Sequence, residues 1–195
     1  MRRALAAAAA ALIIASLAGC TADPLAEQYR SGSTQNYISG DGSVTTITAE
    51  NRGDPVEFEG VTAEGDAVSS ADYEGQVVVL NFWYAACPPC RVEAPDLEKL
   101  HVSLEDESVS FLGVNVRDQA DTARTFETET GVTYPSVIDA NDGNLLLAFA
   151  GTVAPNAVPT TLVIDKQGRV AARFLGQVES PSALDTIIRD TIAEK

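Results

Sequence analysis

The stretch Val77–Arg91, VVVLNFWYAACPPCR, joins an apolar run to a two-cysteine turn. The run Val77–Leu80 is typical of a strand covered on both faces, as in the middle of a parallel or mixed sheet. Two adjacent prolines cannot continue such a strand, because neither donates a backbone N–H. Prolines are tolerated in the first turn of a helix, so the sequence predicts a strand, a turn and a helix, with Cys87 at or near the N-cap.

Cys87 and Cys90 are therefore candidates for a redox-active pair. The free N–H groups and the dipole at a helix N-terminus stabilise a thiolate, lowering its pKa from about 8.5 toward roughly 3.5–7.5. We expect Cys87 to be the exposed nucleophile and Cys90 to resolve a mixed disulfide formed at Cys87. Beyond this disulfide we expect no cofactor and no metal, because no phosphate-binding loop or zinc cluster is evident.

The length and charge of the chain limit the remaining possibilities. At 195 residues it has room for one well-packed domain. Its formal net charge is −15, which argues against nucleic-acid binding through a basic patch, since phosphate neutralisation requires clustered Lys and Arg. An acidic, solvated surface is the simpler interpretation.

The N-terminus reads as a secretory signal, with two arginines followed by the apolar run 4–18. The run is shorter than the about 20 residues that a transmembrane helix requires. Leu-Ala-Gly-Cys at 17–20 resembles the bacterial lipobox, which predicts a lipoprotein signal at 1–19 and lipidation at Cys20; an ordinary signal peptide with a chance cysteine is the alternative. Residues 20–44 are expected to form a flexible tether, and residues 45–195 the folded domain.

The rest of the chain alternates strand and helix patterns. The expected strands are 56–61, 67–68, 77–80, 109–116, 134–138, 160–164 and 169–175; the expected helices follow Cys90 and cover 119–130, 145–150 and 180–193. Asn141 and Asp142 are expected to cap the short helix at 145–150. In the helix after Cys90, Val92 is placed on the apolar side with three leucines. This order predicts an α/β sandwich around a central mixed sheet, with an extra N-terminal hairpin.

Three motifs give the chain a resemblance to the thioredoxin fold, and more narrowly to the TlpA/ResA-like thiol-disulfide oxidoreductases of the redoxin (AhpC/TSA) superfamily. They are Asn81-Phe82-Trp83 before the cysteines, Glu93 and Pro95 after them, and Val158-Pro159-Thr160-Thr161 before the last hairpin. The resemblance implies a three-layer α/β/α sandwich with a central insertion. Residues 134–151 correspond to that insertion, and residues 141–144 within it are weak candidates for partner recognition.

The resemblance also implies roles for single residues. Pro159 is expected to be cis and to face the cysteines, where the backbone of Val158 binds an extended substrate. Glu93 lies one helical turn after Cys90, where its carboxylate is expected to take and return the proton of the inner thiol. Asn81 stands where many cytoplasmic thioredoxins carry a buried Asp, so Glu93 is expected to take over that proton transfer.

Other candidates lie at the rim of the site. Trp83 matches a family tryptophan beneath the active site, although simple core packing explains it equally well. Ala86 stands where relatives often have Trp, and Tyr84 is expected to compensate in contacting partners. Pro88 and Pro89 are further candidate substrate contacts.

The function implied is that of a lipid-anchored, extracytoplasmic oxidoreductase that reduces protein disulfides. The family suggests a membrane electron donor of the thiol-reductase type and, as one substrate, the cysteines of apocytochrome c. A disulfide-donating oxidase is the alternative within the same chemistry, because the sequence does not give the reduction potential.

Two other classes fit the sequence less well. A Sco-like copper chaperone requires three residues between its cysteines and a distant loop histidine, whereas this spacing is two and the single histidine, His101, falls in a helix. A peroxiredoxin places Thr three residues before its reactive cysteine, where this chain has Tyr84.

Overall fold

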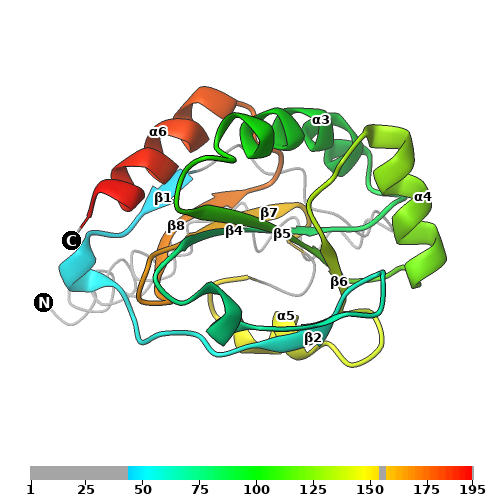
Figure 1. Cartoon of the computed structure of the whole chain (residues 1–195), viewed down its shortest axis with the longest axis horizontal. Coiled ribbons are helices and arrows are strands. Elements are labelled where there is room, and N and C mark those ends of the chain that lie inside the picture. The colour runs from blue at the N-terminus through cyan, green and yellow to red at the C-terminus, as the bar shows by residue number, and fades with distance from the viewer. Residues whose placement is uncertain (1–43, 154–156, 195) are drawn as a thin grey trace, which may run out of the picture. The chain divides into compact units, whose positions relative to one another are not determined.

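The computed structural model describes residues 44–153 and 157–194. The predicted strand lies inside its sheet, and the predicted helix that follows covers one face of that sheet (Figure 1). Six strands form one sheet in the order β1 (Val44–Thr46), β8 (Val170–Leu175), β7 (Thr160–Ile164), β4 (Val77–Trp83), β5 (Val109–Asn115) and β6 (Ser136–Ile138). The central strand β4 runs parallel to β5 and antiparallel to β7. The sheet is therefore mixed, as predicted.

Helices and a hairpin cover the two faces of this sheet (Figure 1). The helices are α3 (Pro88–Ser103), α4 (Ala120–Thr130), α5 (Asn144–Ala148) and α6 (Pro181–Ala193). The hairpin is β2 (Glu59–Val61) with β3 (Ala67–Ser69), and two 3-10 turns cover Ala49–Asn51 and Ser70–Tyr73. Helices α3 and α6 lie on one face, and α5 and β2 on the other. The expected three-layer sandwich and extra hairpin are confirmed.

Alternation along β4 explains why the sheet is buried on both sides. Val77 and Val79 pack into a cluster with Leu97 of α3 and Ile188 of α6. Val78 and Leu80 belong to a second cluster on the other face, which includes Phe149. Since each fully buried aliphatic side chain contributes about 1.5–3 kcal/mol, β4 anchors both layers and gives the residues that follow it a rigid base.

Helix α3 buries Leu97, and Leu104 follows at its end, as expected, but Val92 is not buried. The predicted burial of Val92 is wrong, because this side chain is 60% exposed. The buried positions are Cys90, Glu93, Ala94 and Leu97, and the helix continues through Pro95. The helical period that buries Cys90 and Leu97 turns Val92 to solvent and brings a carboxylate inward.

The N-terminus of the short helix α5 in the insertion is capped differently from the prediction. The N-cap of α5 is Gly143, in the left-handed conformation at φ 71°. The Asp139 carboxylate accepts hydrogen bonds from Leu145 N at 2.8 Å and Leu146 N at 2.9 Å. Asp142 Oδ1 accepts only from the neighbouring Asn144 N, at 3.3 Å. The predicted capping is therefore only partly correct. Asp142 reaches the first N–H group of α5, and Asp139, five residues before the helix, holds the next two. Asn141 Oδ1 accepts from Gln119 instead.

The domain begins slightly earlier than expected. Val44 already belongs to β1 and pairs with Phe174 of β8. The predicted signal segment, the lipidation site Cys20 and the tether up to residue 43 lie outside the described residues. In the described part of the chain, no helix has both the length and the apolar character needed to cross a membrane.

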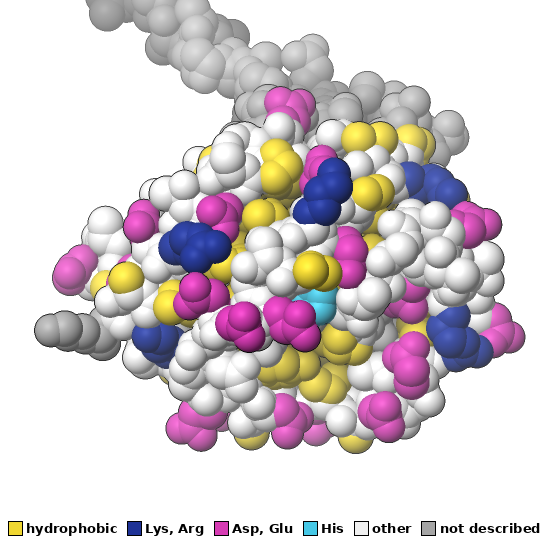
Figure 2. Space-filling view, turned by 45° about the horizontal axis from the view of Figure 1, so that its top comes forward, with side chains coloured by type: hydrophobic (Ala, Val, Ile, Leu, Met, Phe, Trp, Pro, Cys, Tyr) yellow, Lys and Arg dark blue, Asp and Glu magenta, His cyan; other side chains and the backbone are white. Residues whose placement is uncertain are grey.

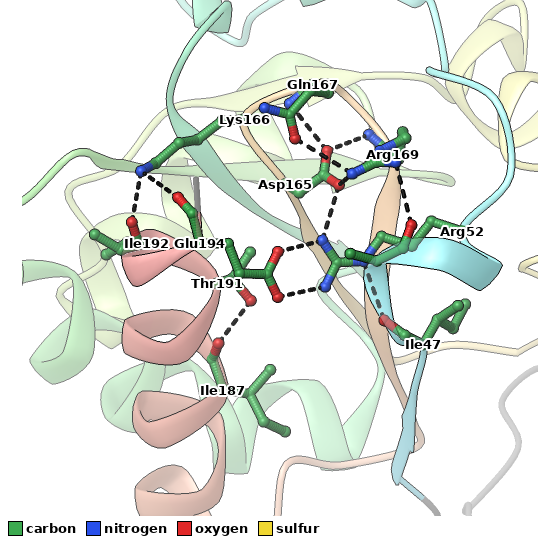
Figure 3. Close-up of polar contacts among 11 residues, drawn as sticks. Ile47, Arg52, Asp165, Lys166, Gln167, Arg169, Ile187, Thr191, Ile192 and Glu194 are labelled. Atoms are coloured by element: carbon green, nitrogen blue, oxygen red, sulfur yellow. Dashed lines mark hydrogen bonds and ion pairs between the residues drawn. The ribbon is translucent and has the colours of Figure 1, made fainter.

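Charged residues join three segments at the end of the sheet where β4 begins (Figure 3). Arg52 donates to Asp165, just after β7, at 2.9 Å and forms a two-pronged contact with Glu194 after α6. Arg169, at the start of β8, donates to the same Asp165 at 2.8 Å. These contacts hold the segment after β1, which contains Arg52, and the end of α6 to the turn between β7 and β8.

Most of the remaining charge lies on the surface. Figure 2 shows Asp and Glu side chains spread over the face that it presents, with Lys and Arg side chains between them. The acidic excess of the composition is thus distributed over this face.

Candidate active site

The two cysteines form a disulfide at the N-terminus of α3. The S–S distance is 2.09 Å and the Cα atoms are 5.3 Å apart. Cys87 is the N-cap, with Pro88 and Pro89 in the first helical positions, and its sulfur accepts a hydrogen bond from Cys90 N at 3.3 Å. The predicted N-cap is confirmed. A backbone N–H aimed at Cys87 Sγ is the contact that favours a thiolate there after reduction.

Cys87 is buried in this disulfide-bonded state. Its exposed fraction is 0%, and that of Cys90 is 1%. The prediction of an exposed nucleophile is therefore wrong for the oxidised form, because Cys87 packs into a cluster with Trp83 and Val158. Its neighbours Ala86 and Pro88 are exposed, so a partner meets these residues first.

Glu93 lies one turn after Cys90 with its carboxylate enclosed by three elements. It is 1% exposed. Its Oε1 accepts from Asn81 Nδ2 in β4 at 2.8 Å, and its Oε2 accepts from Val178 N, between β8 and α6, at 2.8 Å. Both carboxylate oxygens thus have a neutral N–H donor.

This environment gives Glu93 a proton affinity suited to neutral pH. Burial raises its pKa to about 7, against the smaller lowering effects of the hydrogen bonds from Val178 and Asn81. A carboxyl group with this pKa both accepts and returns a proton near pH 7, as general acid–base catalysis requires. The expected placement of Glu93 beside the inner cysteine agrees with the structure, and its role in proton transfer remains a prediction.

The loop before Cys87 is held by the loop after β5. Tyr84 is buried, and the Arg117 guanidinium lies 4.3 Å from the centre of its ring. Asp118 Oδ2 accepts from Ala85 N at 2.6 Å, and Arg91 Nη1 donates to Ala85 O at 3.3 Å. Tyr84 is therefore packed within this loop in the oxidised form, and its contact with partners remains a prediction.

Trp83 and the Val158–Pro159 segment complete the site. The Trp83 ring stacks on Phe126 of α4 with centroids 4.3 Å apart. The Val158–Pro159 peptide is cis, as the family resemblance implied. Val158 packs in the same buried cluster as both cysteines. The structure thus brings Trp83 and Val158 to the disulfide, while substrate contact by Val158, Pro159, Pro88 and Pro89 remains a prediction.

Sequence reasoning missed three partners of the site. Thr161, Val178 and Asp118 were not singled out as functional, although Val178 N donates to Glu93, Thr161 accepts from Asn81, and Asp118 accepts from Ala85 N in the loop before Cys87. For Asp118 a signal exists, because the spacing Asn115-x-x-Asp118 is typical of an Asx turn, and Asn115 Oδ1 does accept from Asp118 N at 2.7 Å. Thr161 and Val178 are far from Glu93 in sequence, and no local pattern marks them.

Metal ligands do not gather in the described part of the chain. Within residues 44–153 and 157–194, no group of three or more His, Cys, Asp or Glu side chains is placed to hold a metal ion. The single histidine, His101, packs against the rings of Phe111 and Tyr134.

Comparison with known proteins agrees with this arrangement. The model of the AhpC/TSA family matches residues 53–173. The chain belongs to the AhpC/TSA family. Among relatives, the thiol-disulfide oxidoreductase ResA of Halalkalibacterium halodurans is 34% identical over 113 residues, which is 58% of this chain and 61% of ResA. The thiol:disulfide interchange protein HelX of Rhodobacter capsulatus is 31% identical over 69% of this chain and 72% of HelX.

Solved structures of similar proteins align with this chain over a larger part of their own length than ResA and HelX do. A secreted thiol-disulfide isomerase from Corynebacterium glutamicum aligns with TM-score 0.71 and 34% identity, covering 80% of this chain and 96% of that one. A DsbF homologue from Corynebacterium diphtheriae aligns with TM-score 0.69 and 37% identity, covering 78% and 96%. The thioredoxin-like fold is therefore shown.

Proposed function

We propose that the chain is a thiol–disulfide oxidoreductase that reduces disulfides in other proteins through Cys87 and Cys90. The observation that carries the proposal is the cysteine pair at a helix N-cap with the buried Glu93 carboxyl one turn away. The activities named for ResA and HelX support it. The chemistry requires no cofactor beyond the disulfide itself.

The reaction follows from the geometry in two steps. In the reduced protein, the Cys87 thiolate attacks one sulfur of a substrate disulfide; an S–S bond forms to Cys87, and the substrate's other sulfur leaves as a thiolate. Glu93 then takes the proton of the Cys90 thiol, and the Cys90 thiolate attacks Cys87 Sγ. The second substrate sulfur leaves, and the Cys87–Cys90 disulfide of this structure is formed. Two electrons pass to the substrate, which becomes a dithiol after taking up two protons.

Substrate and location follow from the same proposal. The backbone of Val158 and the ring of Pro159 position an extended substrate over the cysteines, with Trp83, Tyr84, Pro88 and Pro89 forming the surroundings. The secreted relative from Corynebacterium glutamicum supports an extracytoplasmic location. We further propose that lipid on Cys20 anchors the protein to the membrane, that a thiol-reducing membrane protein recharges it, and that apocytochrome c is one substrate.

The decisive test is the reduction potential of Cys87–Cys90 in the full chain in detergent, equilibrated against glutathione and dithiothreitol buffers. We expect a value near or below about −270 mV, the level of thioredoxin. A value near about −120 mV, as for strong oxidants, would make the protein a disulfide donor and overturn the reductase proposal.

A trapping experiment tests the assignment of the two thiols. Cys90→Ser is expected to accumulate a mixed disulfide at Cys87 with a disulfide-bonded peptide that carries the two cysteines of apocytochrome c. Cys87→Ser is the matched control and is expected to trap none. Trapping at Cys90 instead would reverse the roles of nucleophile and resolving thiol.

A further inference from the structure

Asn81 lies between Glu93 and a second polar side chain in the middle of the sheet. The pairing of β4 with β7 sets Asn81 directly opposite Thr161. Asn81 Nδ2 donates to Glu93 Oε1 at 2.8 Å and to Thr161 Oγ1 at 3.1 Å. All three side chains are buried. Leaving a buried polar group without a hydrogen-bond partner costs about 1–3 kcal/mol. Asn81, Glu93 and Thr161 must therefore keep hydrogen-bond partners whether Glu93 is ionised or protonated.

The observed pattern matches ionised Glu93. Its two oxygens both accept, one from Asn81 and the other from the backbone N–H of Val178. When Glu93 takes a proton, one oxygen becomes an O–H donor and needs an acceptor. Val178 N–H cannot accept. The Asn81 amide can, because its oxygen and nitrogen ends have nearly the same shape and exchange places by a half-turn.

We propose that Asn81 and Thr161 form a reversible hydrogen-bond switch that lets Glu93 gain and lose a proton without moving. With Glu93 ionised, Asn81 presents its N–H₂ to Glu93 and Thr161. With Glu93 protonated, the amide turns, and Asn81 Oδ1 accepts from the Glu93 O–H and from the Thr161 hydroxyl. A threonine hydroxyl serves both states, since it donates as readily as it accepts. Asn81 and Thr161 are thus positioning residues that act through Glu93, and the inference rests on the proposed proton transfer by Glu93.

Few other charges interfere with this arrangement. Burial and the hydrogen bonds from Val178 and Asn81 are the causes of the Glu93 pKa shift, and no charged side chain among the described residues is one of them. The charge of Glu93 helps to raise the pKa of Tyr134, which lies before β6. Burial is the larger cause of that shift. On α3 the titratable groups one turn away are Cys90, which does not titrate in the disulfide, and Asp96, which forms a surface ion pair with Lys99. Glu179, next to Val178, is exposed. The oxidised protein therefore isolates the titration of Glu93.

The orientation of the amide is the first test. In the oxidised full chain, NMR coupling across the hydrogen bond from Asn81 Nδ2 to the Glu93 carboxyl carbon is followed from pH 5 to pH 9. We expect the coupling above the Glu93 midpoint and its loss below. In Glu93→Gln the new amide accepts from Val178 N–H and donates to Asn81, so Asn81 is expected to be in its acceptor orientation at every pH. Coupling that persists below the midpoint would overturn the switch.

Thr161→Val gives an independent test. The substitution removes one hydrogen bond in each state. In the ionised state it leaves one Asn81 N–H without any acceptor, whereas in the protonated state Asn81 Oδ1 loses the bond from Thr161 but still accepts from Glu93. The Glu93 midpoint, measured by the carboxyl ¹³C shift, is therefore expected to rise by about 0.5–1 pH unit, or about threefold to tenfold in its dissociation constant. If Asn81 were a fixed donor, both states would lose the same bond, and an unchanged midpoint would refute the proposal.

Two variants serve as controls for this measurement. Thr160→Val makes the same change one residue away, where the hydroxyl donates to Ala157 O instead, and is expected to leave the midpoint unchanged. Thr161→Ser keeps the hydroxyl and is expected to retain the wild-type midpoint. The result is also distinct from the proposed function: if Glu93→Gln leaves the rate and pH profile of thiol exchange unchanged, proton transfer by Glu93 falls, while the orientation data stand alone.

Discussion

Glu93 of α3 and Asp165, just after β7, are both buried carboxylates, yet their hydrogen-bond donors differ. Glu93 is near the cysteines and accepts only from neutral N–H groups. Asp165 lies beyond the other end of β4 and accepts from two arginines, Arg52 and Arg169, as well as from backbone N–H groups (Figure 3).

The pKa values move in opposite directions as a result. Burial raises the pKa of Glu93 to about 7. Burial also acts to raise that of Asp165, but hydrogen bonds from the Arg169 backbone and from the Arg52 and Arg169 side chains outweigh it, so the pKa is lowered. Asp165 is thus committed to its charge and holds segments together, whereas Glu93 exchanges its proton near neutral pH. Hydrogen bonds from backbone N–H groups and from two arginines, more than burial, distinguish the structural carboxylate from the candidate catalytic one.

Asp165→Asn tests the structural half of this comparison and is expected to have the largest effect. It leaves Arg52, whose side chain is 4% exposed, without one of its two carboxylate partners. Breaking a buried ion pair costs about 3–5 kcal/mol, and we expect about 3 kcal/mol in this case because Glu194 remains. Urea unfolding of the oxidised protein at pH 7 measures it.

The pH dependence of the same variant checks its cause. A lowered pKa contributes stability that is present above the unfolded value, about 3.9, and is lost as the pH falls through the folded one. The deficit of Asp165→Asn should therefore shrink in acid. A deficit that stays constant down to unfolding in acid would assign the loss to packing instead.

Glu93→Gln tests the candidate catalytic carboxylate of this comparison. Its effect on the free energy of unfolding is expected to have the opposite sign. A raised carboxyl pKa contributes stability that is full below the unfolded value and is lost as the pH rises through about 7. The neutral variant avoids this loss, so its stability relative to wild type should rise between about pH 4.5 and pH 7, by about 3 kcal/mol at 1.36 kcal/mol per unit. Denaturant unfolding across this range checks it.

A matched control keeps this result specific. Glu105→Gln changes an exposed residue and should give a flat difference from wild type over the same pH range. If Glu93→Gln were equally flat, Glu93 would titrate at its ordinary pKa and the comparison with Asp165 would fail.

Glu194→Gln is expected to have the smallest effect. Its side chain is 38% exposed, although it faces the same Arg52. Ion pairs in contact with solvent contribute about 0.2–1 kcal/mol, and Arg52 keeps Asp165 in this variant. We expect a loss below about 1 kcal/mol that declines with added salt. A loss as large as that of Asp165→Asn would mean that Arg52 depends equally on both partners.

The features predicted best from the sequence are those that neighbouring residues determine. The N-cap at Cys87 follows from two prolines and a strand end, and the turn of helix from Cys90 to Glu93 follows from their spacing. Helix α6 begins in the same way, with Ser180 as its N-cap and Pro181 as its first residue. Such features depend on backbone hydrogen bonds within a few residues, which local sequence specifies.

What failed depends on contacts that are distant in sequence. The burial of Cys87 comes from packing with Val158, and the partners of Glu93 come from β4 and from the segment before α6. Val92 was predicted to be buried because its side chain is apolar, but the helix buries the next residue, Glu93, instead. A polar residue at a buried position breaks the hydrophobic pattern, and in this chain that break marks the candidate site.

The position of Trp83 has a practical consequence. It is the single tryptophan of the chain, and it packs in one cluster with Cys87 and Cys90. Because a disulfide close to an indole ring quenches its emission, opening and closing of the Cys87–Cys90 bond should change the intrinsic fluorescence. The protein thus carries its own optical reporter, and electron transfer to a partner can be followed without attaching a label.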